Sequence, residues 1–201
     1  MIISGRSRRP GGCRDLPAGG VRQSPSVALL IVVTGPPGAG KSTVARALAS
    51  EFDRSALVEG DVFFAFLARG AVAPWLSAAH AQNEIVTRAA AAAAGGYAAG
   101  GYDTVYDGVV GPWFLPAFTG AAGVERLHYA VLLPPARQCL DRIASRTGHG
   151  FTDQVAARHM HDQFARSAVD PRHVLLNAPG EASNTAREIL RRARAGTLSY
   201  P

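Results

Sequence analysis

Lysine is nearly absent from this sequence, since Lys41 is the only lysine among 21 basic residues. Arginines therefore carry the formal net charge of +6 at pH 7. A basic balance is typical of proteins that bind nucleic acid, and equally of proteins that bind anionic nucleotides or phosphates. Because the arginines are spread along the chain rather than gathered in one stripe, we expect a nucleotide ligand and do not expect a nucleic-acid partner.

Cysteine and long apolar runs are scarce as well. Cys13 and Cys139 are the only cysteines, which excludes a disulfide framework and favours a reducing, cytoplasmic environment. No apolar run approaches the ~20 residues of a membrane-spanning helix, so we expect no membrane partner. With 201 residues, 47% of them hydrophobic, the chain is long enough for one domain with a sizeable core.

Residues 1–25 differ from the rest of the chain. They are rich in arginine, glycine, proline and serine, carry almost no apolar periodicity and lack the apolar segment of a secretory signal. Such a composition buries too little apolar surface to offset the entropy lost on ordering, so it predicts a disordered basic arm. We expect the folded domain to occupy residues 26–201 and to keep its stability when residues 1–25 are deleted.

One motif organises the residues that are present. Gly35–Thr43 matches the phosphate-binding pattern G-x-x-x-x-G-K-[ST] at every fixed position. A continuous apolar run at 27–33 predicts a buried strand before it, and the apolar spacing in 44–52 predicts a helix after it. The free N–H groups at that helix N-terminus favour a phosphate, so a chance glycine turn is the weaker explanation. We expect nucleotide binding by Gly35, Pro36, Pro37, Gly38, Ala39, Gly40, Lys41, Ser42 and Thr43.

Strands alternate with helices along the chain. We predict strands at 27–33, 55–59, 104–106, 127–133 and 172–176. We predict helices at 44–52, 62–69, 77–100, 134–148, 153–167 and 185–195, and a loop or short helix at 111–116. This alternation predicts an α/β fold with a parallel sheet between two layers of helices. Right-handed crossovers then bring all the strand-to-helix loops to the carboxyl edge of the sheet.

Local signals set the expected helix ends. Ser77 is expected to cap the longest helix, Thr152 the helix that starts at 153, and Thr185 the last helix. Gly95-Gly96 is expected to weaken or break the longest helix, and Gly100-Gly101 to end it.

Two carboxylates follow neighbouring strands. Asp61 comes after the second strand and Asp107 ends the third, so both should lie near a bound γ-phosphate. Phosphoryl transfer needs a group that accepts the proton of the attacking hydroxyl and a carboxylate that serves Mg²⁺. We assign Asp61 to the substrate hydroxyl as catalytic base, and Asp107 to the metal together with the Ser42 hydroxyl, or to both metal and substrate. The swapped assignment and simple helix capping by either aspartate stay open.

Arginines lie on the helix after the fourth strand. Arg142 and Arg146 are four residues apart and therefore share one helix face. Arginines that close onto a transferring phosphoryl group stabilise its charge, so we predict that both are catalytic and belong to a lid at about 142–166. A solvated helix end is the alternative. His159 and His161 are expected on a helix surface.

Large apolar and polar side chains follow the second and third strands. The aromatic side chains of Phe64, Trp75 and Trp113 are candidates for the walls of a substrate pocket, although each suits ordinary core filling as well. Asn83 and Arg88, on the longest predicted helix, are candidate polar contacts to the substrate.

With these residues placed, the chain resembles the small-molecule kinases of the P-loop class. Gly35–Thr43, Gly60–Phe63 and Tyr106–Gly108 are similar to the chloramphenicol phosphotransferase and zeta-toxin-like group, and Arg146–Phe151 is similar to the lid of gluconate kinases. The resemblance covers residues 27–195. It implies a three-layer α/β/α sandwich with a five-stranded parallel sheet in the order 2-3-1-4-5, a small helical lid, ATP as the nucleotide, and Asp61 as the base.

Three interpretations of function stay open. The first is an ATP- and Mg²⁺-dependent phosphotransferase that acts on a hydroxyl of a small metabolite or antibiotic. The second is a zeta-toxin-like kinase of a nucleotide sugar. The third is an ATPase or nucleotide-dependent switch that acts on a protein or nucleic acid. The short chain has no separate effector domain, which favours a kinase.

Overall fold

The computed structural model describes residues 28–145, 153–176 and 182–201. The predicted arm at 1–25 lies outside the described residues, and so do 146–152 and 177–181. The strands are β1 (Leu30–Thr34), β2 (Ser55–Glu59), β3 (Asp103–Asp107), β4 (Leu127–Leu132), β5 (Val174–Leu175) and β6 (Ser199–Tyr200). The α-helices are α1 (Lys41–Ala49), α2 (His80–Ala99), α3 (Leu115–Ala122), α4 (Ala136–Ala144), α5 (Gln154–Arg166) and α6 (Ala182–Arg194). Three 3₁₀ helices complete the described part: η1 (Gly60–Phe66), η2 (Ser77–Ala79) and η3 (Pro171–His173).

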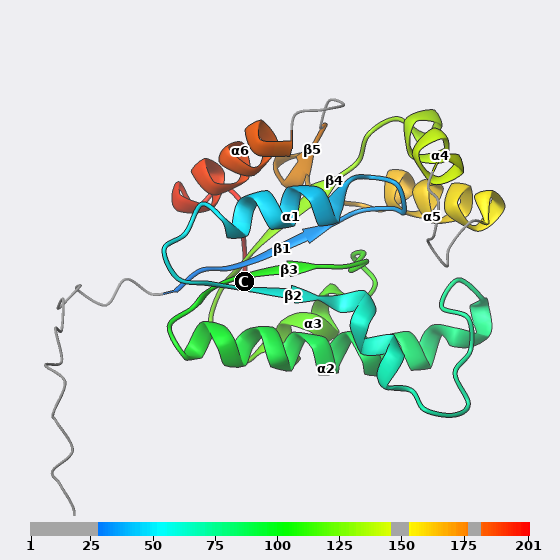
Figure 1. Ribbon diagram of the computed structural model, residues 1–201, viewed down its shortest axis with the longest axis horizontal. Coiled ribbons are helices and arrows are strands. Elements are labelled where there is room, and N and C mark those ends of the chain that lie inside the picture. The colour runs from blue at the N-terminus through cyan, green and yellow to red at the C-terminus, as the bar shows by residue number, and fades with distance from the viewer. Residues whose placement is uncertain (1–27, 146–152, 177–181) are drawn as a thin grey trace, which may run out of the picture.

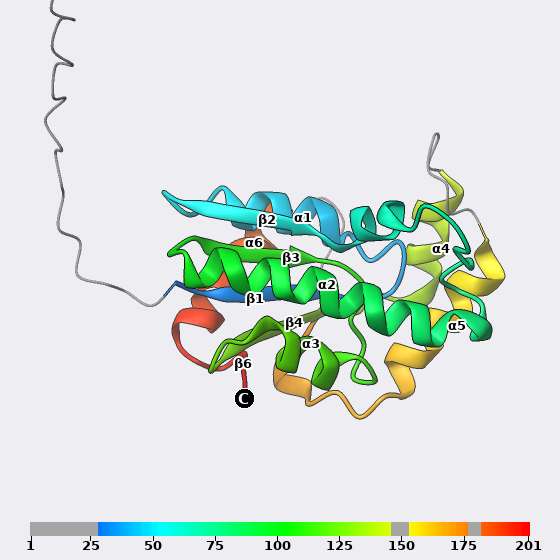
Figure 2. The same ribbon diagram turned by 90° about the horizontal axis from the view of Figure 1, so that it is seen from below.

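The sheet has the predicted order. Its parallel strands run β2-β3-β1-β4-β5, with β1 hydrogen-bonded to β3 on one side and to β4 on the other (Figures 1 and 2). A sixth strand, β6, which the sequence did not predict, pairs with β4 in the antiparallel sense. All five parallel strands therefore end at one edge, where the segments that carry the predicted site residues emerge.

Helices cover both faces of the sheet, as Figure 1 shows: α1 and α6 lie on one face, and α2 and α3 on the other. Successive β1 side chains point to opposite faces. Leu30 and Val32 join the core beneath α2 and α3, whereas Ile31 and Val33 join the core beneath α1 and α6. Because both faces of β1 are buried, its continuous apolar run is the pattern expected of a central parallel strand.

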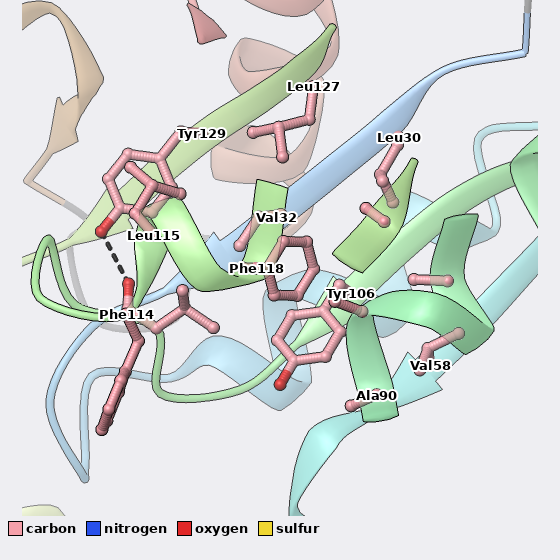
Figure 3. Packing of buried hydrophobic residues seen from close by; sticks show 14 of the residues in the cluster. Leu30, Val32, Val58, Ala90, Tyr106, Phe114, Leu115, Phe118, Leu127 and Tyr129 are labelled. Atoms are coloured by element: carbon pink, nitrogen blue, oxygen red, sulfur yellow. Dashed lines mark hydrogen bonds between the residues drawn. The ribbon is translucent and has the colours of Figure 1, made fainter. Parts of the chain in front are cut away.

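The core beneath α2 and α3 is rich in aromatic side chains. Phe118 is fully buried and lies with Val32, Tyr106 and Leu115 in Figure 3. Burial of each such side chain stabilises the fold by roughly 1.5–3 kcal/mol. The Tyr129 hydroxyl donates a hydrogen bond to the Val110 carbonyl oxygen (2.7 Å), which satisfies the one polar atom that this ring brings into the core.

Helix α2 differs from its prediction at two points. It starts at His80, after η2, and Ser77 makes no capping hydrogen bond. It also continues unbroken through Gly95-Gly96 and ends before Gly100 as predicted. The structure explains Gly95: a Cβ atom there would overlap the carbonyl oxygen of Ala122 in α3. The glycine therefore permits two helices to approach closely, which outweighs its low helix propensity.

The later helices also differ in their ends. Helix α5 is capped by Asp153, whose side chain accepts hydrogen bonds from the backbone N–H groups of Val155 and Ala156 at 2.9 Å each. The predicted cap Thr152 lies outside the described residues. Helix α6 starts at Ala182, so Thr185 is buried within the helix and is not its cap. The segment at 111–116 leads into α3, a helix that the sequence left undecided.

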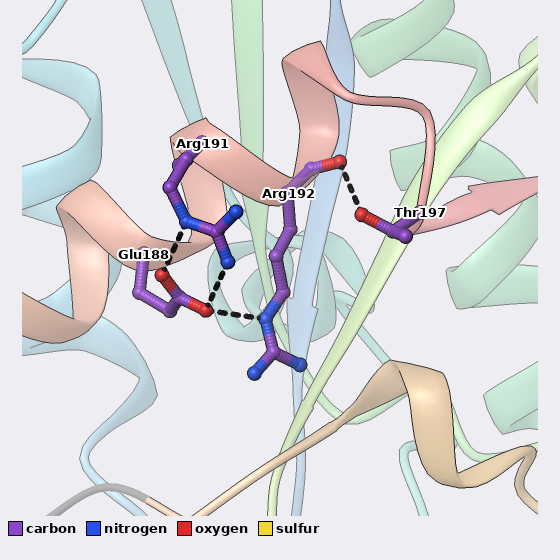
Figure 4. A network of polar contacts seen from close by, with 4 residues as sticks. All are labelled: Glu188, Arg191, Arg192 and Thr197. Carbon is purple, nitrogen blue, oxygen red and sulfur yellow. Dashed lines mark hydrogen bonds and ion pairs between the residues drawn. The ribbon is translucent and has the colours of Figure 1, made fainter.

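The outer face of α6 carries a network of charges. The Glu188 carboxylate accepts hydrogen bonds from Arg191 and Arg192, which lower the pKa of Glu188 to about 2 (Figure 4). The Arg192 carbonyl oxygen also accepts a hydrogen bond from the Thr197 hydroxyl. These pairs neutralise part of the arginine charge on this helix. None of the described helices is long and apolar enough to cross a membrane.

Candidate nucleotide and phosphoryl-transfer site

The glycine-rich loop joins β1 to α1 as predicted. Gly38 and Gly40 have φ angles of +80° and +90°, in the region that residues with side chains rarely adopt. A Cβ atom on Gly38 would overlap the carbonyl oxygen of Cys139, because α4 packs directly against the loop. The Lys41 ammonium donates a hydrogen bond to the Pro36 carbonyl oxygen (3.2 Å) and so folds back over the loop. The backbone therefore forms a cradle of N–H groups at the N-terminus of α1.

Asp107 lies beside this cradle, at the end of β3 and next to Val33 of β1. Its carboxyl group is buried, and both the Lys41 charge and the Ser42 side chain act on it. Burial raises the pKa of Asp107 above its ordinary value, and Lys41 and Ser42 oppose that rise. The structure thus brings Ser42, Lys41 and Asp107 together, as the sequence predicts for a nucleotide site.

Asp61 lies in η1, on the segment that leaves β2, and its side chain is exposed. Its negative charge acts on Asp107 and raises the pKa of Asp107 further. The two carboxylates therefore face the same region, one buried at the phosphate-binding loop and the other open to solvent. This difference in burial agrees with different roles for them, although the roles stay predictions.

Arg142 reaches the phosphate-binding loop from α4. Its Nη1 atom donates a hydrogen bond to the Gly38 carbonyl oxygen at 3.2 Å, across a separation of 104 residues in the chain. Arg146, the second predicted lid arginine, lies outside the described residues. The positive charge of Arg142 is therefore held against the loop that would bind the phosphates.

Helix α5, the second part of the predicted lid, is attached to the core by His161. This histidine is buried, and its Nε2 lies 2.9 Å from the Pro134 carbonyl oxygen at the end of β4. The prediction that His161 lies on a helix surface is wrong. Ala157, His161 and Phe164 form the buried face of α5, and their spacing of four and three residues is the signal that could have revealed it.

Aromatic side chains connect the segment after β3 to α5. Trp113 packs edge-on against Phe164 of α5, with 5.2 Å between ring centroids, and also contacts Phe114. Phe114 in turn stacks on His80, the first residue of α2. Trp75 and Trp113 are each 38% exposed, so both present apolar surface to solvent. Phe64 is half-buried in η1.

The two polar candidates on α2 have different surroundings. The Asn83 amide nitrogen donates a hydrogen bond to the Pro74 carbonyl oxygen (2.7 Å), while its Oδ1 is buried without a partner among the described residues. The neighbouring Gln82 pairs with both backbone groups of Val72. Asn83 and Gln82 therefore hold the segment before α2 in place. Arg88 is exposed on α2.

Two residues near the site were not predicted from the sequence. The Thr34 hydroxyl is buried and bonds both the N–H (2.8 Å) and the carbonyl oxygen (3.2 Å) of Val110, which ties the end of β1 to the segment after Asp107. Tyr106 directs its hydroxyl toward Gly60 and Gly108, which flank the two aspartates. The signal in the sequence was that each aspartate has a glycine beside it, in Gly60-Asp61 and Asp107-Gly108. These two glycines make room for the Tyr106 hydroxyl.

Comparisons with known proteins agree with this geometry. A family described as an AAA domain matches residues 30–171. A search of curated proteins gave no match.

Three solved structures share the fold. The APS kinase of Mycobacterium tuberculosis, in complex with AMPPNP and APS, has a TM-score of 0.64 at 17% identity, covering 85% of this chain and 99% of that chain. A sugar kinase from Janibacter sp. HTCC2649 has a TM-score of 0.62 at 22% identity, covering 84% and 97%. The tunicamycin resistance protein of Deinococcus radiodurans has a TM-score of 0.61 at 14% identity, covering 87% and 99%. The fold is thus the P-loop α/β fold that these proteins share.

Proposed function

The chain belongs to the AAA domain family, and from this membership and the site geometry we propose that it is an ATP- and Mg²⁺-dependent phosphotransferase. It moves the γ-phosphoryl group of ATP to a hydroxyl of a small molecule. The observation that carries the proposal is that Ser42 and Lys41, at the start of α1, both act on the buried carboxyl group of Asp107 at the end of β3. The fold shared with an APS kinase and a sugar kinase supports the proposal.

The residues of the loop suit the phosphates and Mg²⁺. Gly38 lets α4 pack directly against the loop, since a side chain there would overlap the backbone of α4. The Ser42 hydroxyl and the Asp107 carboxylate are the hard oxygen donors that Mg²⁺ prefers, and these two residues would hold it. When bound, Mg²⁺ neutralises phosphate charge. Lys41 then pairs with the β- and γ-phosphates, and Arg142 places a second positive charge at the same loop.

Asp61 is the proposed base. As the acceptor oxygen forms its bond to the γ-phosphorus, the Asp61 carboxylate takes the proton of the acceptor hydroxyl. The bond from the γ-phosphorus to the bridging oxygen breaks, and its electron pair leaves with the nucleoside diphosphate. Asp61 is exposed on the segment after β2. The acceptor hydroxyl would attack from that side, opposite the leaving group.

The acceptor is proposed to lie against the aromatic side chains that follow β2 and β3. Phe64, Trp75 and Trp113 would contact its body, and the buried Oδ1 of Asn83 would accept a hydrogen bond from it. Arg88 would contact the outer end of the acceptor. Carboxylates favour a neutral hydroxyl over an anionic group, so a sugar, a metabolite or an antibiotic alcohol suits the site better than a nucleoside monophosphate.

Transfer of radiolabel from [γ-³²P]ATP tests the proposal. Wild-type protein with Mg²⁺ is incubated with sugars, sugar acids, amino alcohols and aromatic alcohols, and the products are separated by chromatography. We expect label on at least one acceptor. Lys41→Ala should lose transfer by at least about 10²-fold and bind ATP more weakly. Arg46→Ala, on the exposed face of the same helix, is the matched control and should keep both.

The role of Asp61 is tested in the same assay. Asp61→Asn should keep ATP binding and cut transfer by at least about 10²-fold, because the amide takes no proton. Asp53→Asn, an exposed carboxylate before β2, should transfer at the wild-type rate. ATP hydrolysis with no labelled acceptor would contradict the phosphotransferase and favour a nucleotide-dependent switch.

A further inference from the structure

Tyr106 lies in β3 immediately before Asp107 but points to the opposite face of the sheet. Its ring is buried in the core beneath α2 and α3, 3% exposed, and packs edge-on against Phe118 with 4.8 Å between ring centroids. In Figure 3 the hydroxyl is directed away from Phe118. The ring is therefore fixed by the core, and its polar end is held at one place near the edge of the sheet.

That polar end lies between two glycines. A Cβ atom on Gly60 would overlap the Tyr106 hydroxyl oxygen, and a Cβ atom on Gly108 would come within 2.6 Å of it. Gly60 precedes Asp61, and Gly108 follows Asp107. The hydroxyl therefore touches the backbone of both segments that carry the candidate catalytic carboxylates, and the two glycines are the residues that make room for it.

A tyrosine hydroxyl carries one proton that it can donate in a hydrogen bond. Because Gly60 directly precedes Asp61, the Tyr106 hydroxyl lies beside the backbone that carries this exposed carboxylate.

We propose that Tyr106 is a positioning residue that donates a hydrogen bond to the Asp61 carboxylate during transfer and turns that carboxylate toward the acceptor hydroxyl. The proposal rests on the proposed function, because it assigns Tyr106 a task in that reaction. Tyr106 keeps its own proton throughout. One carboxylate oxygen of Asp61 accepts the bond from Tyr106, and the other takes the proton of the acceptor as the new oxygen–phosphorus bond forms.

Tyr106→Phe tests this role, since phenylalanine keeps the ring and its contact with Phe118. The substrates are MgATP with the acceptor that the wild-type protein labels, and MgATP with water as the acceptor. We expect kcat to fall about tenfold and the KM for ATP to stay within about twofold, because the lost bond acts on the base and not on nucleotide binding. In the Asp61→Asn background the same change should have little further effect on kcat.

Tyr129→Phe is the matched control. This tyrosine lies in the same core, but its hydroxyl bonds the Val110 carbonyl oxygen. It should lower the melting temperature and leave kcat within about twofold of wild type. If the wild type is active, two results would overturn the positioning role and leave the proposed function standing. One is an unchanged kcat in Tyr106→Phe. The other is that Tyr106→Phe lowers kcat by the same factor in the wild-type and Asp61→Asn backgrounds. Wild-type protein that transfers no phosphoryl group would overturn the proposed function, and the role of Tyr106 with it.

Discussion

The guanidinium group of Arg142 donates a hydrogen bond to the backbone carbonyl oxygen of Gly38, so helix α4 is tied to the loop that would hold the phosphates. Arg142 is half-buried, and the backbone of its own helix leaves no room for a side chain on Gly38. The cation is thus positioned before any nucleotide arrives. Such preorganised charge stabilises a transition state without the cost of reorganisation.

Arg142→Ala should lower kcat by about 10²-fold and raise the KM for ATP much less. The reason is that the Arg142 charge stabilises the transition state of phosphoryl transfer more than it stabilises bound ATP. Steady-state kinetics with MgATP measure both constants. Arg137→Ala is the control: Arg137 lies on the same helix, and its side chain is 94% exposed beside Asp141. Near-normal kcat in Arg142→Ala would mean that this arginine only supports the loop.

Asp107 links stability to pH. Burial raises its pKa in the folded state, so the folded protein binds this proton more tightly than the unfolded chain does. The free energy of unfolding therefore falls as pH rises from the unfolded value, about 3.9, through the folded value, and the loss is complete above it. Asp107→Asn removes that loss, and it also removes a proposed magnesium ligand.

The melting temperature of Asp107→Asn, without nucleotide, should accordingly exceed that of the wild type at pH 7.5. The difference should shrink as the pH falls toward about 4. Scanning calorimetry across this range gives the curve, and exposed Asp53→Asn controls for the change in net charge. A melting temperature below the wild type at pH 7.5 would show that the ionised carboxylate stabilises the fold.

The adjacent glycines of α2 should respond in opposite ways to alanine. Gly95→Ala places a methyl group against the Ala122 carbonyl oxygen, whereas nothing lies within 4 Å of the corresponding position on Gly96. We expect Gly95→Ala to destabilise by roughly 1–3 kcal/mol through overpacking. Gly96→Ala should stabilise by up to about 1 kcal/mol, since alanine is the better helix former. Urea unfolding of both variants measures the difference, and equal shifts would contradict the close approach of α2 and α3.

His161 should contribute to stability, unlike its neighbour on α5. His161→Ala removes a buried ring and its hydrogen bond to Pro134, so the free energy of unfolding should fall by roughly 1–3 kcal/mol. His159 is exposed, and His159→Ala should change it by less than about 0.5 kcal/mol. Chemical unfolding compares the two. Similar losses from both changes would argue that the bond to Pro134 contributes nothing.

The sequence correctly predicted those strands, loops and helices that are determined by residues close together in the chain. The second strand has the predicted bounds, 55–59, because turn residues flank a short apolar run. The loop, its strand and its helix follow from a pattern that is itself local. The strand order, in contrast, was implied by resemblance to P-loop kinases, and the pairing confirms it.

Features that depend on distant contacts were missed. Gly95 looked like a helix breaker because the residue that requires it, Ala122, lies on another helix. The strand β6 has two residues, too few for any periodicity. It pairs with the start of β4, whereas β5 pairs only with the end of β4. Tyr106 looked like an ordinary strand residue, since its position between Gly60 and Gly108 exists only once β2 and β3 pair.

The single lysine of the sequence has a practical consequence for labelling. Reagents that acylate lysine side chains have one such target, Lys41, and it lies in the phosphate-binding loop. A nucleotide in the loop would shield that amine, so the fraction of protein acylated at Lys41 would report the fraction of empty sites. Attachment to a surface or a dye through lysine would block the same loop, and a tag for single-molecule work therefore has to be introduced elsewhere.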